Sequence, residues 1–173
     1  MRVDDYLARM PIGELISRIV NLNAGLEQFW SRSHGWAPQE AASLLTKSRL
    51  DWQVSLSSSL RNWLTADDGK ISDGDLILAW ANLGALVEGT LKILLCVFYK
   101  DFLNDPLAKS NPKFFDATRQ VVRSPDALQL ELVRQFCNKR DLLDKREASF
   151  VELVQKRRNA IHAFEDRSIG SPS

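Results

Sequence analysis

The chain has 173 residues, of which 45% are apolar and 26% are charged. This length suffices for one sizeable hydrophobic core and is too short for two comfortable domains, so we expect a single domain over residues 1–173. With 23 basic and 22 acidic residues the net charge is +1, so the total charge does not indicate a nucleic-acid or membrane partner.

The charges are nevertheless distributed unevenly. Residues 1–106 carry 10 basic and 13 acidic groups, whereas residues 107–173 carry 13 basic and 9 acidic groups. Any surface that faces a polyanion is therefore expected in the last third of the chain. Solvated helix faces alone can also produce a contrast of this size.

The first half of the chain predicts two long helices. Apolar residues recur at three- and four-residue steps after Pro11 and predict an amphipathic helix over residues 12–31. Pro38 fits the first position of a second helix, whose period continues to about residue 64. A polar turn is expected over residues 65–74.

Several aromatic and imidazole side chains of this region are open to more than one interpretation. Four tryptophans fall on helical apolar stripes and are expected in the core rather than as base-stacking platforms: Trp30, Trp52, Trp63 and Trp80. His34 lies in a turn with no nearby acid or nucleophile, and we interpret it as a surface residue.

A central core helix is predicted over Asp75–Asp101, because this segment is apolar almost all round the helical wheel. The segment is long enough for a membrane span, but Asn82, Glu88 and Lys92 interrupt the apolar run. We therefore expect this helix to be buried within the protein, with no membrane partner.

Three further helices are expected after an irregular connection around Pro106. A short helix is predicted over about 112–121, a fourth main helix from Ser124 to about residue 142, and a fifth over 147–164. These segments would complete the fold of the domain.

No stretch of the chain keeps the alternation of a strand, so the predicted fold class is all-α. We expect an up-and-down bundle of four to five helices. Its core would span about residues 12–166, with a flexible tail over 167–173.

The cysteines and the glycines limit the chemistry. Cys96 and Cys137 lie in apolar surroundings and are interpreted as free buried thiols, and no Cys/His cluster fits zinc. The absence of a Gly-rich phosphate loop excludes Walker-type and dinucleotide-binding motifs, so no metal or cofactor is expected. The first residues resemble neither a signal peptide nor a transit peptide, and a cytoplasmic location is expected.

The densest cluster of reactive side chains lies in residues 156–164, Lys-Arg-Arg-Asn-Ala-Ile-His-Ala-Phe. On a helical wheel, Arg157 falls inside the apolar stripe of the fifth helix, which contains Phe150, Leu153, Val154, Ile161 and Phe164. A buried guanidinium needs a carboxylate, a cleft or a subunit interface. Glu88 is an acid within the predicted core helix, so we predict that Arg157 and Glu88 meet.

Arg158 and His162 are four residues apart and therefore share one side of the same helix. They can point together into a cleft, where neighbouring charges let His162 titrate near neutrality. The structural alternative is a solvated helix end, whose basic residues complement the helix dipole and whose His is a cap.

These residues resemble the HEPN superfamily (higher eukaryotes and prokaryotes nucleotide-binding domains). HEPN domains are all-α bundles of four or five helices, with an Arg and a His separated by four to six residues on a late helix. Arg157, the four residues 158–161 and His162 match this spacing. The core-helix segment 83–92 is similar to an earlier HEPN helix that carries an acidic residue, here Glu88.

The resemblance implies a metal-independent endoribonuclease of the toxin or defence class, with RNA as substrate and the active site at a homodimer interface. His162 would act as general base or acid at the ribose 2′-OH or the leaving 5′-oxygen, leaving a 2′,3′-cyclic phosphate. Arg157 would stabilise charge on the phosphoryl oxygens. Asn159 would orient the phosphate or His162, and Glu88 would hold Arg157.

The sequence departs from the HEPN pattern at two positions. Arg158 stands where members commonly have Asn, Asp or His, so the functional arginine is Arg157 by spacing or Arg158 by helical face, and both stay open. Phe164 stands where some HEPN toxins carry a Tyr that a partner antitoxin modifies by nucleotidyl transfer. An antitoxin or nucleotidyltransferase partner stays open as well.

Two other functions remain alternatives. The first is a catalytically inactive HEPN module that binds nucleotide, RNA or a protein partner. The second is a plain helical bundle in which Arg157 and Glu88 form a structural ion pair.

Overall fold

The computed structural model describes residues 6–7, 9–33, 35, 38–64 and 71–159. Over these residues the chain is mainly helical, so the predicted all-α class is confirmed. The remainder of the sequence includes His34 and residues 160–173. The predictions made for His34, for His162, for Phe164 and for the tail therefore lie outside the described residues.

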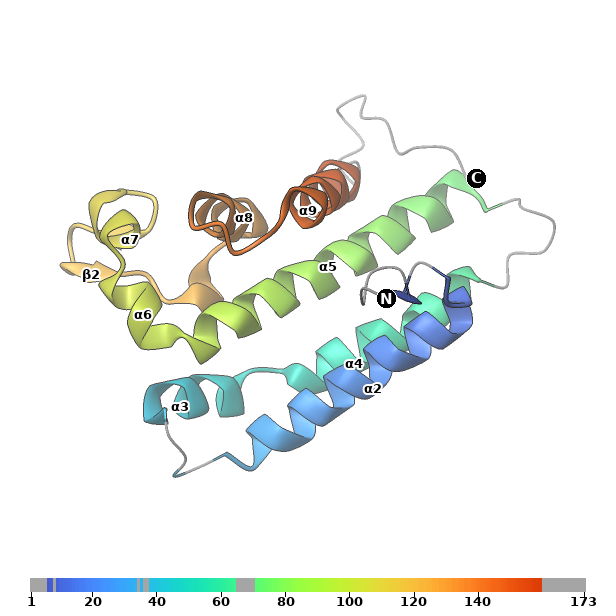
Figure 1. The fold of residues 1–173 in the computed structure, drawn as a ribbon, viewed down its shortest axis with the longest axis horizontal. Coiled ribbons are helices and arrows are strands. Elements are labelled where there is room, and N and C mark those ends of the chain that lie inside the picture. Colours follow the sequence, from blue (N-terminus) through green and yellow to red (C-terminus); the bar gives the residue numbers. More distant parts are fainter. Residues whose placement is uncertain (1–5, 8, 34, 36–37, 65–70, 160–173) are drawn as a thin grey trace.

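The first predicted helix is confirmed at both ends, because α2 spans Ile12–Ser31 directly after Pro11. The fixed backbone φ angle of proline suits the start of a helix. Helix α2 runs alongside α4 (Leu50–Ser59), and the two form one layer of the molecule (Figure 1).

The predicted second helix over 38–64 is wrong in its continuity. The segment forms α3 (Gln39–Lys47), α4 and a 3₁₀ turn, η1 (Leu60–Trp63). The chain becomes extended at Ser48, where the Ser48 hydroxyl donates to the Leu44 carbonyl oxygen at 3.0 Å. Such a side-chain bond competes with the helical backbone pattern, and it offers a physical reason for the break.

Helix α5 (Asp73–Val97) is the central element, as predicted, and passes between α2 with α4 on one side and α8 with α9 on the other (Figure 1). Ser72 caps it by accepting a hydrogen bond from the Asp75 N–H at 3.1 Å. The predicted continuation to Asp101 is wrong, because the chain turns at Phe98 and restarts as α6 (Tyr99–Asn104).

By length and hydropathy, α5 is the one helix in the described part of the chain that has the composition of a membrane span, and 33% of its most apolar window is buried inside the protein. The core helix of a soluble protein has the same length and composition. This property alone therefore indicates neither a membrane nor a cellular location.

The predicted short helix over 112–121 is wrong. A helix comes earlier, as α7 (Pro106–Ser110), and is followed by a hairpin of β1 (Phe115–Asp116) and β2 (Val121–Val122). The two strands are antiparallel, and Phe115 is opposite Val122. Asp116 turns the chain by accepting the backbone N–H groups of Thr118 and Arg119, which a helix would bond to carbonyl oxygens.

The predicted fourth helix from Ser124 to 142 is also interrupted. A 3₁₀ turn, η3 (Pro125–Ala127), is followed by extended residues and then by α8 (Leu130–Lys139). Leu128 and Leu130 are both buried, although they are only two residues apart. An extended connection satisfies this spacing, whereas a helix would turn the two side chains to different faces.

Helix α9 (Lys145–Arg158) begins two residues before the predicted start of the fifth helix. Asp144 and Glu147 form a capping box, in which the Asp144 carboxylate accepts the Glu147 N–H and the Glu147 carboxylate accepts the Asp144 N–H, both at 2.8 Å. Asn159 is the residue that caps the C-terminal end of α9.

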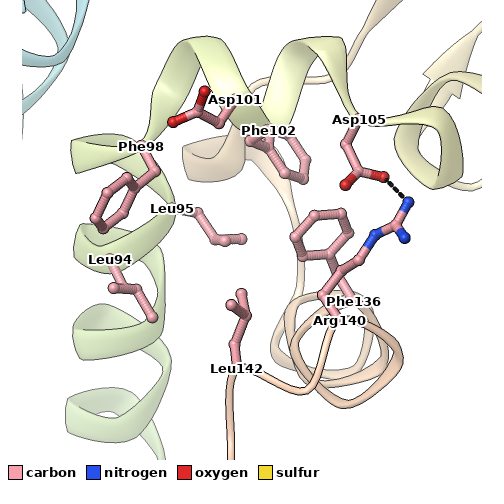
Figure 2. A pocket seen from close by; sticks show the side chains of 9 residues that line it. All are labelled: Leu94, Leu95, Phe98, Asp101, Phe102, Asp105, Phe136, Arg140 and Leu142. Carbon is pink, nitrogen blue, oxygen red and sulfur yellow. Dashed lines mark hydrogen bonds and ion pairs between the residues drawn. The ribbon is translucent and has the colours of Figure 1, made fainter.

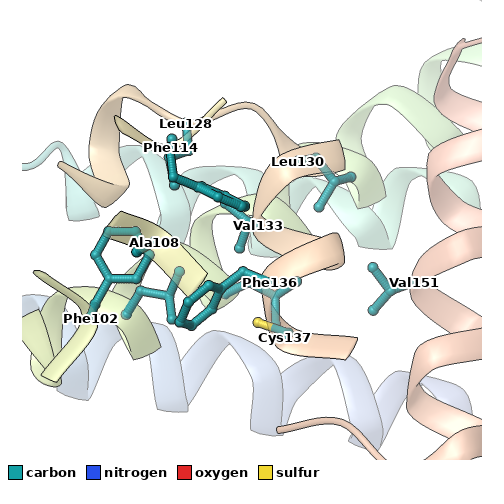
Figure 3. Close-up of a cluster of buried hydrophobic side chains, with 11 residues drawn as sticks. Phe102, Ala108, Phe114, Leu128, Leu130, Val133, Phe136, Cys137 and Val151 are labelled. Carbon is teal, nitrogen blue, oxygen red and sulfur yellow. The ribbon is translucent and has the colours of Figure 1, made fainter. Parts of the chain in front are cut away.

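Two hydrophobic clusters lie on opposite sides of α5. The larger cluster joins α5, α6, α8 and α9 around Phe102, Phe114 and Phe136, and Val151 reaches it from α9 (Figure 3). The smaller cluster joins α5 to α2 and α3 around Trp30 and Leu45. Cys96 belongs to the smaller cluster and Cys137 to the larger one, and both are free, as predicted.

Candidate functional site

An ion pair at the end of α9 joins this helix to α5. Arg158 Nη1 donates to Glu88 Oε2 at 2.6 Å and to the Gly84 carbonyl oxygen at 3.3 Å. Lys92 Nζ contacts the other carboxylate oxygen, Glu88 Oε1, at 2.8 Å. One carboxylate on the core helix therefore binds two cations, one from its own helix and one from the last helix.

Gly84 makes room for this arginine. A Cβ atom built on Gly84 would lie 2.5 Å from Arg158 Cδ and 2.9 Å from Arg158 Cβ. The arginine stem therefore crosses α5 directly against the backbone. Gly84 and Glu88 are one helical turn apart, so the same face of α5 supplies both the space for the stem and the carboxylate for the guanidinium.

The pair is partly shielded from solvent. The side chains of Glu88, Lys92 and Arg158 are 19%, 22% and 30% exposed. Burial by itself raises the pKa of Glu88, but the hydrogen bonds from Lys92 and Arg158 outweigh it and hold the pKa below its ordinary value. Glu88 is therefore ionised at neutral pH, and the guanidinium of Arg158 remains reachable from solvent.

The predicted contact between Arg157 and Glu88 is wrong in its arginine, because Arg158 makes the contact. The sequence interpretation placed Phe150, Leu153 and Arg157 on the buried stripe. In the structure Phe150 and Leu153 are exposed, and the buried residues are Val151 and Val154.

Arg158 follows these two valines on the same face of α9, at steps of seven and four residues. Because Phe150 and Leu153 are apolar although exposed, the sequence interpretation chose a face of α9 that is displaced by one residue from the buried one. In the sequence, the face that carries Arg158 is marked by Val151 and Val154, the two residues of α9 that are buried.

A second polar network fixes α9 against α8. Arg134 Nε donates to Gln155 Oε1 at 2.7 Å, and Arg134 Nη2 contacts Glu131 Oε2 at 3.1 Å. Gln155 also donates to the Glu131 carboxylate. These contacts lie one turn before Arg158 and hold the last turn of α9 in place relative to α5.

Lys92 connects the pair to a third segment. Its ammonium group donates to the Asp126 carbonyl oxygen in η3 at 3.2 Å, in addition to its contact with Glu88. Lys92 therefore links η3 to the ion pair that joins α5 and α9.

The structure brings together two of the five predicted site residues, Glu88 and Arg158. Arg157 and Asn159 are half-buried neighbours at the end of α9, and the Asn159 N–H bonds to the carbonyl oxygens of Gln155 and Arg157. His162 lies outside the described residues, so its approach to Arg158 stays a prediction. Lys92 is the residue of this cluster that the sequence interpretation missed as a partner of Glu88.

Comparisons of the chain with protein-family models, with curated proteins and with solved structures found no match.

A separate apolar pocket of about 360 Å³ lies where α5 turns into α6 (Figure 2). Leu94, Phe98 and Leu142 face its interior, and at its rim the Arg140 guanidinium binds the Asp105 carboxylate. None of the predicted site residues within the described part of the chain lines this pocket. A ligand bound in this pocket would therefore not contact Arg158 or Glu88.

Proposed function

We propose that this protein is a metal-independent endoribonuclease of the HEPN type, acting in cellular defence or as a toxin. The observation that carries the proposal is the ion pair between Arg158 and Glu88. It holds a guanidinium on the last turn of α9, within reach of solvent and four residues before His162 in the sequence. Among the two arginines left open by the sequence, this contact favours Arg158.

The proposed reaction needs one proton acceptor and one cationic group. The imidazole of His162 takes the proton of a ribose 2′-hydroxyl while the 2′-oxygen bonds to the adjacent phosphorus. The bond from phosphorus to the 5′-oxygen breaks, and that oxygen receives a proton from water or a second imidazole. The products are a 2′,3′-cyclic phosphate and a 5′-hydroxyl.

Arg158 is given the electrostatic role in this reaction. Its guanidinium stabilises the negative charge that develops on the non-bridging phosphoryl oxygens. Glu88 acts as a positioning residue, because it restricts the rotamer of Arg158 without touching the substrate. Arg157 and Asn159 are the sequence neighbours of Arg158 at the end of α9 and are proposed to contact neighbouring phosphates.

We also propose that the protein acts as a homodimer joined through α9. Helix α9 exposes two large apolar side chains, Phe150 at 46% and Leu153 at 43%, on the face next to Val151 and Val154. Burying them against a second copy would bring two arginine clusters together. Sedimentation at micromolar concentration tests this, and a strictly monomeric protein contradicts it.

The activity is tested by incubating the purified protein with total RNA in EDTA. We expect cleavage to persist without metal and to fall at least about 100-fold in His162→Ala, as expected for loss of a general base. Arg158→Ala should also lose cleavage. The matched control is Lys156→Ala, because Lys156 lies on the same helix in a solvent-exposed pair with Glu152 and should retain cleavage.

The second candidate is a catalytically inactive HEPN module that binds nucleotide, RNA or a protein partner such as an antitoxin or a nucleotidyltransferase. The ion pair between Arg158 and Glu88 is equally compatible with this candidate, because a guanidinium bound by a carboxylate can link α9 to α5 without contacting a phosphate. RNA binding without cleavage at any protein concentration supports this candidate and contradicts the endonuclease.

A further inference from the structure

A second feature of the molecule lies at the end formed by α6, α7 and the β hairpin (Figure 1). An open groove of about 1000 Å³ runs between these elements. We define the basic groove by six of the residues that line it: Tyr99, Lys109, Phe115, Arg119, Arg123 and Ser124. None of them belongs to the cluster around Glu88.

The groove is positively charged. Lys109, Arg119 and Arg123 are all exposed and line it together with a single acid, Asp116. The Asp116 Oδ1 atom accepts the backbone N–H groups of Thr118 at 3.0 Å and Arg119 at 3.1 Å, so this carboxylate is used to form the hairpin turn. The three cations therefore exceed the negative charge of the lining.

The two arginines interact with Asp116 through space only, since both charges help to lower the pKa of that carboxyl group. Within the described residues neither the Arg119 nor the Arg123 guanidinium makes a hydrogen bond or an ion pair, and Lys109 Nζ bonds only to the neutral Asn104 Oδ1 at 3.1 Å. By contrast, Arg134, Arg140 and Arg158 each form an ion pair with a carboxylate. The cations of the groove are thus available to an external anion.

The wall of the groove contains further groups that suit a nucleotide. The Ser124 hydroxyl oxygen is buried and has no hydrogen-bond partner in the described part of the chain, and such a group is unfavourable until a ligand or water pairs with it. Tyr99 and Phe115 are half-buried in the lining and can each present a ring to a base.

The size and the arrangement of the groove favour a strand over a single anion. Its volume is at the upper end of small-ligand sites, which span roughly 300–1,000 Å³. The three cations come from three separate segments, α7, the hairpin turn and the connection after β2. A positively charged groove that also contains aromatic rings is typical of sites that bind single-stranded nucleic acid.

We propose that the basic groove binds single-stranded RNA, with Lys109, Arg119 and Arg123 on successive phosphates and Tyr99 stacked on a base. The excess of positive charge in residues 107–173 supports the same ligand class. The choice of RNA over DNA rests on the proposed function, whereas binding of a strand by the groove does not depend on cleavage.

The test measures fluorescence anisotropy of a labelled 12-nucleotide RNA and of the DNA with the same sequence, in EDTA. All proteins carry His162→Ala so that the RNA stays intact. The groove variant is Lys109→Gln, Arg119→Gln and Arg123→Gln, and the control variant is Arg32→Gln, Lys47→Gln and Arg61→Gln. The control removes the same net charge from exposed positions directly after α2, on α3 and on η1.

We expect the groove variant to bind RNA at least tenfold more weakly than the control variant, with both variants folded by circular dichroism. Neutralising three phosphates of a single strand predicts a slope of about −2 for log K against log salt concentration, and the groove variant should lose most of this slope. Tyr99→Leu should weaken binding without changing the slope, because it removes stacking and no charge.

The remaining outcomes are also decisive. Equal weakening in the groove and control variants, or no RNA binding at low salt, overturns the proposal, and binding confined to DNA overturns RNA as the ligand. Groove-dependent binding by a protein that never cleaves RNA supports the basic groove and contradicts the endonuclease. The same three groove substitutions are also made in a protein that keeps His162, and cleavage by that protein with an unchanged KM keeps the endonuclease and overturns the groove.

Discussion

The stem of Arg158 lies directly against the backbone of Gly84, so that a methyl group at Gly84 would overlap the arginine side chain. The same arginine places its guanidinium 2.6 Å from Glu88 Oε2. The contact between α9 and α5 thus depends on Gly84, which leaves space for the arginine stem, and on Glu88 one turn later, which binds its guanidinium. This relationship gives the first prediction.

Gly84→Ala should destabilise the protein by about 1–3 kcal/mol, because the added methyl group displaces Arg158 or the end of α9. Gly25→Ala on α2 is the matched control, since a Cβ there meets no atom within 4 Å. That substitution should stabilise the helix by roughly 0.5–1 kcal/mol. Urea unfolding measures both changes, and an equal effect of the two substitutions would contradict the packing described.

Glu88→Gln should lower the free energy of unfolding by about 1–3 kcal/mol at neutral pH, because Arg158 and Lys92 lose their partly buried counter-charge. The pKa of Glu88 in the folded protein is below its ordinary value, so its contribution is complete above that ordinary value. It disappears as the pH falls through the lowered value.

The difference between wild type and Glu88→Gln should therefore be largest above about pH 5 and should shrink in more acidic solution. Glu14→Gln is the control, since Glu14 forms an exposed pair with Arg18 one turn away on α2. Its stability should stay close to wild type across the same range. A constant difference for Glu88→Gln at all pH values would show that its charge is not involved.

The two cysteines should be unreactive in the folded protein. Burial raises the pKa of Cys96 to about 12 and that of Cys137 to about 11, so the thiolate that attacks a disulfide reagent is scarce at about pH 8. We expect no fast reaction with Ellman's reagent before unfolding and two thiols per chain in denaturant. Rapid labelling of either cysteine under native conditions would indicate that its helix opens locally.

Asp144→Ala should cost about 1 kcal/mol, because the first turn of α9 loses the carboxylate that accepts the N–H groups of Arg146 and Glu147. Asp144→Asn keeps an acceptor at this position and should recover most of the loss. Thermal unfolding of the two variants measures the contribution of the cap. Equal destabilisation by Ala and Asn would attribute the effect to charge rather than to the hydrogen bonds.

The sequence predicted those elements whose pattern is local. Helix α2 follows from Pro11 and an unbroken amphipathic repeat, and the central position of α5 follows from its apolar composition. The breaks at Ser48 and Phe98 and the hairpin after Asp116 were missed. They depend on side-chain hydrogen bonds and on tertiary packing, which compete with a helical period that continues through them.

The sequence identified Glu88 and the arginines of α9 as site residues, but it did not identify which arginine binds Glu88. Glu88 was identified because an acid in an apolar helix needs a cation, and an arginine of α9 was identified as that cation. The choice between Arg157 and Arg158 failed because Phe150 and Leu153 are apolar but exposed. Hydrophobicity therefore favoured the face of Phe150 and Leu153, whereas the contacts of Arg158 with Gly84 and Glu88 are evident only in the folded structure.

Helix α5 contributes Leu91 and Leu95 to one hydrophobic cluster, while the next residue, Cys96, belongs to the cluster on its other side. Both clusters therefore depend on α5. Unfolding of the helices on one side of α5 would expose its apolar side chains there and destabilise the packing on its other side. Melting is therefore expected to be a single cooperative transition, and fragments that end on either side of this helix should not fold alone.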